Sequence, residues 1–171
     1  ETADRLGLPL LQLPDDVRFT ELADAVSREI ARRQIPAEQE RQLAVLLHHL
    51  VSGAPVDEAI ERQTAEVGIR LECPHILLRI RADVPELQRR AWLHEAESRC
   101  RTLGANVWGA LLEENILLML EADDLYALEI PLRQMMADFA AEHGSSCGVS
   151  RPYGGTAGIR KADHSARTAL R

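Results

Sequence analysis

The sequence has few aromatic residues, almost no lysine and no long apolar run. Aromatic residues make up 4% of its 171 residues, so a core has to be built mainly from Leu, Ile, Val and Ala. Lys161 is the one lysine among 20 basic residues. The longest apolar runs, such as residues 116–120, are far shorter than the roughly 18 residues that a membrane span needs. We therefore expect no membrane segment.

Cysteine and positive charge are also scarce. Cys73, Cys100 and Cys147 lie far apart and form no Cys-x-x-Cys pair, which is typical of reduced thiols in a cytoplasmic protein. The formal net charge is −7, and neither half of the chain has an excess of basic residues. Contacts to a phosphate backbone need such an excess, so DNA binding by this chain alone is disfavoured.

Apolar residues repeat at three- and four-residue spacing in the first part of the chain and predict helices. After a short apolar run at residues 8–13, the helices cover about residues 19–34, 37–53 and 55–68. The middle helix carries a wide leucine stripe, made of Leu43, Leu46, Leu47 and Leu50. Such a stripe can serve as a partner surface, and we expect it to form the interface of a homodimer.

From residue 70 onward the pattern changes to alternating strands and helices. The predicted elements are a strand at 75–81, a helix at 85–104, a hairpin of strands at 106–112 and 116–121, a helix at 123–144 and a strand at 147–150. The order βαββαβ is that of a ferredoxin-like fold, in which two helices cover one face of four antiparallel strands. We therefore predict an α+β chain with three parts: residues 1–35, a helical segment at 36–69 and a ferredoxin-like domain at 70–171.

Pairs of potential metal ligands occur, but none forms a complete site. His48 and His49 are adjacent on a helix and point about 100° apart, so they cannot chelate one ion from one face. His94 and Glu97 are one turn apart and lack a third ligand. We expect no metal, no cofactor and no catalytic residue.

Two turns could in principle bind a ligand. Glu113-Glu114 at the hairpin tip is typical of an exposed polar turn. Gly154-Gly155, followed by Gly158 before the last helix, resembles a phosphate cradle but lacks the lysine of a P-loop. If this turn binds phosphate, Arg151, Arg160 and Lys161 are the candidate contacts.

The last segment of the chain resembles a known family. Val149-Ser150-Arg151-Pro152, the Gly154-Gly155 turn and the helix ending Ser165-Ala166-Arg167-x-Ala169-Leu170 are similar to the end of the GGDEF-like domain in bacterial transcription regulators of the PucR/CdaR group. Residues 3–14, with their Leu-Pro-Leu-x-x-Leu-Pro segment, together with residues 19–22 resemble the tail of the PucR N-terminal sensing domain. The two similarities occur in the order that the family uses.

This resemblance implies a regulatory and dimerisation fragment without catalytic activity. In the family, an effector signal passes from a sensing region through the GGDEF-like domain to a C-terminal helix-turn-helix, which we expect beyond Arg171. DNA would be bound only through that domain. The alternative is a degenerate GGDEF-type domain that binds nucleotides without cyclising them.

An active diguanylate cyclase is disfavoured by the residues at the corresponding motif positions. Cyclases carry Gly-Gly-Asp/Glu-Glu-Phe on the central hairpin, whereas this hairpin reads Leu112-Glu113-Glu114-Asn115-Ile116 and has no glycine. Their metal-binding Asp stands at the end of the first strand, where this chain has Arg79-Ile80-Arg81. Arginine repels Mg²⁺, so we expect no cyclase activity.

Overall fold

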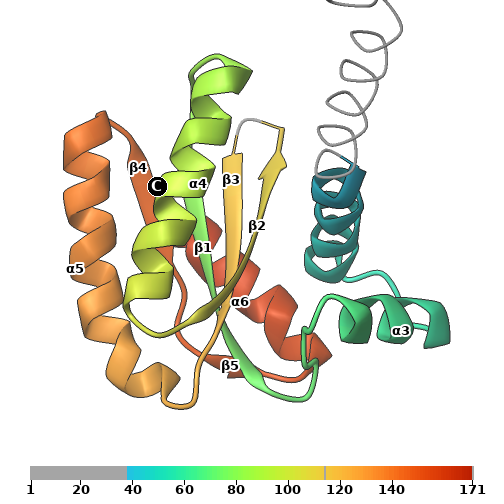
Figure 1. The fold of residues 1–171 in the computed structure, drawn as a ribbon. Helices are drawn as coiled ribbons and strands as arrows, with labels where there is room; N and C mark the ends of the chain where they lie inside the picture. The colour runs from blue at the N-terminus through green and yellow to red at the C-terminus, as the bar shows by residue number, and fades with distance from the viewer. Residues whose placement is uncertain (1–37, 114, 171) are drawn as a thin grey trace, which may run out of the picture. The chain divides into compact units, whose positions relative to one another are not determined.

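A computed structural model describes residues 38–113 and 115–170 of the chain (Figure 1). The described residues from Glu40 onward belong to one compact unit. The sensing-domain tail predicted at residues 1–35, including the helix at 19–34, lies outside the described residues.

An antiparallel sheet forms the centre of this unit. Its strands are β1 (Pro74–Arg81), β2 (Asn106–Leu112), β3 (Asn115–Glu121), β4 (Ser146–Val149) and the short β5 (Tyr153–Gly154). The strands lie in the order β2-β3-β1-β4, and β5 pairs with the beginning of β1. This is the strand order of a ferredoxin-like fold, so the predicted α+β class and the βαββαβ arrangement are confirmed. The pairing of β5 with β1 was not predicted, because two residues carry no periodicity.

Two helices cover one face of the sheet, as predicted. They are α4 (Glu86–Thr102) and α5 (Leu125–His143), and Figure 1 shows both on the same side of the strands. Asp124 caps α5 by accepting a hydrogen bond from the backbone N–H of Ala127 (2.9 Å), and Gly144 ends it with a left-handed backbone (φ 61°). Trp92 and Phe139 pack edge to face between the two helices.

The opposite face of the sheet is also covered. A helix over residues 38–52 and α6 (Thr156–Ala169) pack there, and α3 (Glu58–Glu66) connects to β1 beside them. Leu47, Leu77, Met119 and Ile159 are fully buried in this second core. The predicted arrangement described the helices on one face and did not place those that cover the other. The apolar runs at residues 76–78 of β1 and 116–120 of β3 are continuous, so both faces of these strands have to be buried.

Close backbone contact holds α6 against the sheet. A Cβ atom added to Gly148 on β4 would lie 2.0 Å from the carbonyl oxygen of Ala166 on α6, so glycine alone fits there. Just beyond β4, Ser150 is fully buried, and its Oγ accepts a hydrogen bond from the N–H of Leu77 (2.9 Å). The Ser150 hydroxyl thus accepts the hydrogen bond that a backbone carbonyl would accept if β4 continued.

We expect Gly148→Ala to destabilise the domain by about 3 kcal/mol or more, because α6 would have to move off the sheet. Urea denaturation followed by circular dichroism measures this change. Gly154→Ala is the matched control, since no atom lies within 4 Å of its added Cβ. Equal stability of the two variants would contradict the close contact.

Candidate functional site

A groove of about 630 Å³ opens beside the β2–β3 hairpin, on the face of the sheet that α6 covers. We call it the arginine groove, because its polar wall includes Arg79, Arg81 and Arg167. Leu112 and Leu170 contribute apolar side chains, and the remaining lining residues are His48, Leu111, Glu113 and Asn115. The side chain of Leu111 packs into the core on the other face of the sheet. The groove therefore joins residues from the helix over 38–52, the end of β1, the hairpin and the end of α6.

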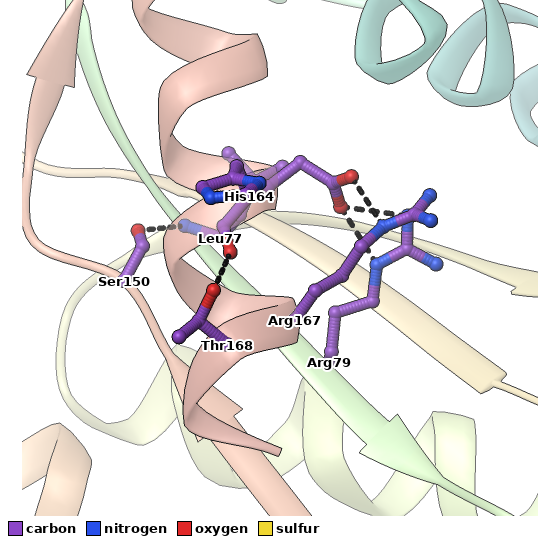
Figure 2. A network of polar contacts seen from close by, with 7 residues as sticks. Leu77, Arg79, Ser150, His164, Arg167 and Thr168 are labelled. Atoms are coloured by element: carbon purple, nitrogen blue, oxygen red, sulfur yellow. Dashed lines mark hydrogen bonds and ion pairs between the residues drawn. The ribbon is translucent and has the colours of Figure 1, made fainter. Parts of the chain in front are cut away.

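Two of these arginines share one carboxylate. Arg79 on β1 places its Nε 2.7 Å and its Nη2 2.6 Å from Oδ1 of Asp163, and Arg167 donates from its Nε to Oδ2 (2.7 Å). Figure 2 shows the guanidinium groups of Arg79 and Arg167 side by side, with their outer nitrogens turned away from the carboxylate. Asp163 therefore fixes both groups in one orientation.

Burial makes this arrangement costly to break. The side chains of Arg79 and Asp163 are 4% and 5% exposed, whereas Arg167 is 60% exposed. Burial lowers the pKa of Arg79, and the charge and hydrogen bonds of Asp163 oppose this shift. Period-2 alternation places Arg79 on the same face of β1 as Leu77, directly under α6. A charge at this position needs its partner on α6.

The family comparison agrees with this fold. The model of the GGDEF-like domain family matches residues 52–171, well over half of the chain. The chain belongs to this family. No curated protein matches it. Among the residues that the structure describes, no helix of this GGDEF-like protein is long and apolar enough to cross a bilayer.

The hairpin of the GGDEF-like domain borders the arginine groove. Glu113 at its tip has a positive φ of 51°, is exposed, and accepts a hydrogen bond from Arg89 at its carbonyl. The groove thus brings one hairpin carboxylate, Glu113, next to three guanidinium groups. A divalent cation would be repelled from such a wall.

The basic residues predicted to contact phosphate are not joined into a site. Arg151, Arg160 and Lys161 are all exposed. Arg160 packs across the turn that ends the helix over 38–52, since a Cβ on Gly53 would lie 2.7 Å from its Cδ. The turn itself begins α6 at Gly155 (φ 73°), without a side-chain cap. The arginine groove lies at the opposite end of α6, beside Arg167 and Leu170.

The leucine stripe predicted as a partner surface packs within the chain. Leu46, Leu47 and Leu50 are 3%, 0% and 4% exposed, and Leu43 is partly buried against the same second core. In this structure a partner could reach them only if the helix were exchanged between two chains.

Each of the two pairs of potential metal ligands has other neighbours in the structure. His49 donates from Nε2 to the carbonyl of Pro55 (2.8 Å), while His48 lines the groove. Glu97 lies 3.9 Å from His94 and pairs with Arg101 at 3.1 Å.

A closer set of potential metal ligands was not predicted. It consists of Glu95, Glu142 and His143, brought together from α4 and α5. Arg99 forms ion pairs with both carboxylates of this set. Its guanidinium group therefore already supplies the positive charge that a metal ion would bring.

The thiols offer no obvious nucleophile. Burial raises the pKa of Cys100 to about 12 and that of Cys147 to about 11, so both are protonated at neutral pH.

A second buried polar cluster lies at the far end of β1 and was also missed. His75 is fully buried opposite Glu121 on β3, with Nε2 3.7 Å from Oε2, and Arg70 pairs with the other carboxylate oxygen of Glu121. Among the residues that the structure describes, neither ring nitrogen of His75 has a partner at full hydrogen-bond geometry. Burial lowers the pKa of His75, and the charge of Glu121 opposes the shift.

We expect Asp163→Asn to destabilise the domain by roughly 3–5 kcal/mol, because it leaves the Arg79 charge buried without a counter-charge. Chemical denaturation at neutral pH measures the loss. Glu129→Gln is the matched control: Glu129 pairs with Arg133 on the surface of α5 at 3.1 Å, and its loss should cost about 1 kcal/mol or less. A similar cost for both substitutions would contradict the role given to Asp163.

We expect the stability of the domain to fall as the pH drops below about 6.5, the ordinary pKa of histidine. His75 has a lowered pKa when folded, so in this range the unfolded chain binds a proton that the folded chain does not. The slope contributed by this residue is at most about 1.4 kcal/mol per pH unit. Denaturation at several pH values measures it. His75→Phe should remove that part of the slope, and His94→Gln, at an exposed position, should not.

Proposed function

We propose that this GGDEF-like protein is a non-catalytic regulatory module of a PucR/CdaR-type transcription regulator. The observation that carries the proposal is the arginine wall beside the hairpin. A cyclase holds metal ions with carboxylates at the end of its first strand, and this domain has Arg79 and Arg81 there. A phosphoryl-transfer reaction without a metal to neutralise the phosphates would lose its main electrostatic stabilisation.

The packing of the second core allows a movement of one helix to be transmitted to another. The helix over residues 38–52 and α6 bury apolar side chains in one cluster, where Leu47 and Ile159 are both fully buried. The side chain of Arg160 packs across Gly53 at the end of the helix over 38–52, which adds a contact between the two elements. A shift of one helix therefore displaces the other, because a close-packed core does not deform continuously. In this proposal the effector signal passes from the N-terminal segment to α6 and on to a C-terminal DNA-binding domain.

We further propose that the protein acts as a homodimer. The leucines of the helix over 38–52 are buried in the second core. They would therefore contribute to the dimer interface only if two chains exchange this helix. Without exchange, exposed apolar residues offer two other surfaces: Val45 on this helix is 66% exposed, and Tyr126 and Ile130 on α5, across the sheet, are 72% and 79% exposed. Bacterial regulators that bind two DNA half-sites need such a two-fold assembly.

Three measurements on the chain test this function. Incubation with GTP and Mg²⁺ should yield no cyclic product, and light scattering at high micromolar concentration should give the mass of a dimer. Turnover of GTP would overturn the non-catalytic assignment. A strict monomer would overturn the dimer. A gel shift at low salt should show no DNA binding by the chain alone, since its net charge is −7.

A further inference from the structure

We propose that the arginine groove binds the phosphate group of a small organic molecule. The inference goes beyond the regulatory role proposed above and does not depend on DNA binding or on dimerisation. It rests on three features of the groove: its preoriented guanidinium groups, its local excess of positive charge and its combination of polar and apolar walls.

The first feature is a pair of guanidinium groups held in place before any ligand arrives. Asp163 engages Nε and Nη2 of Arg79 and Nε of Arg167. The outer nitrogens of both arginines point away from that carboxylate (Figure 2). The Arg79 side chain has little room to change its conformation, since it is 4% exposed under α6. A binding group that is already ordered loses less conformational entropy on binding, which favours affinity.

The second feature is a third arginine at the mouth of the groove. Arg81 lies two residues beyond Arg79 on β1, so both side chains project from the same face of the sheet, roughly 7 Å apart. Arg81 is exposed and has no ion pair within the part of the chain that the structure describes. Three guanidinium groups on one cavity match the several acceptor oxygens of a phosphate better than the two of a carboxylate.

Charge reinforces this preference. The groove sets Arg79, Arg81 and Arg167 against two carboxylates, Asp163 and Glu113, while the chain as a whole carries −7. The groove is therefore locally positive on an acidic protein. Such a concentration of like charge at one concave place raises the local concentration of anions.

The walls define the rest of the ligand. A volume of about 630 Å³ falls in the range of sites for small molecules and is far larger than a free phosphate ion. Leu112 and Leu170 also line it, so the ligand should have an apolar or aromatic body attached to its phosphate. Asn115 and His48 add hydrogen-bonding groups at the rim.

The groove also joins elements through which the effector signal would pass. His48 belongs to the helix over 38–52, Arg167 to α6, and Glu113 to the hairpin. A ligand that contacts all three would stabilise one arrangement of these elements over another, which is how a ligand shifts a conformational equilibrium.

Calorimetry on the chain tests the inference at constant ionic strength, with inorganic phosphate, GMP and succinate as probes. We expect saturable binding of GMP, weaker binding of phosphate and none of succinate. Arg81→Gln and Arg167→Gln should each weaken GMP binding about tenfold or more, because each removes a charge-assisted hydrogen bond. Glu113→Gln should strengthen it by removing a like charge.

Controls separate this site from the turn before α6. Arg151→Gln and Lys161→Gln, which alter exposed cations outside the groove, should leave GMP binding unchanged. Circular dichroism melting curves establish that each variant is folded, and the positions chosen are exposed. No binding of GMP or phosphate at millimolar concentration would overturn the inference. So would binding that Arg81→Gln and Arg167→Gln leave intact, or that succinate reproduces. These outcomes are independent of the cyclase and dimer measurements above.

Discussion

The seating of α6 on the sheet is the constraint on which the rest of the domain depends. Gly148 lets the backbone of α6 approach β4, and this approach places Asp163 where it can neutralise Arg79. The same helix buries Ile159 in the second core together with the helix over 38–52. If α6 were displaced, a buried arginine would lose its counter-charge and one face of an apolar sheet would meet water, so its position is fixed by both effects.

Strand β1 contributes side chains to both cores and also carries buried polar residues. It lies between β3 and β4, and its residues alternate between two cores, with Ile76 and Leu78 toward α4 and α5 and Leu77 toward α6. On the α6 side the strand begins with His75 and continues to Arg79, each matched by a carboxylate from another element. Polar groups this deep are tolerated because partners on β3 and α6 stand opposite them.

Much of the fold could be predicted from the sequence, because its long helices and strands have clear periods and marked ends. The helix predicted at 123–144, for example, matches α5, which Asp124 caps and Gly144 ends. The site was harder to predict, since its charged residues come from β1 and α6 and meet only in the folded chain. Arg79 is a charged residue next to the apolar run of β1, and this unusual position was the available indication of a buried charge. The sequence gives no partner for it, because Asp163 resembles any other surface residue of a helix.

The long sequence separation of the contacts around β1 has a consequence for folding during synthesis. Leu77 meets Ser150 across 73 residues, and Arg79 meets Asp163 across 84. The ribosome releases β1 well before α6, so for that interval the growing chain holds an uncovered apolar strand with an unpaired arginine in it. That arginine can act as a gatekeeper, since a charge within an apolar strand opposes pairing with the strands of neighbouring chains. The residue that later anchors α6 would thus protect the nascent domain from aggregation until α6 arrives.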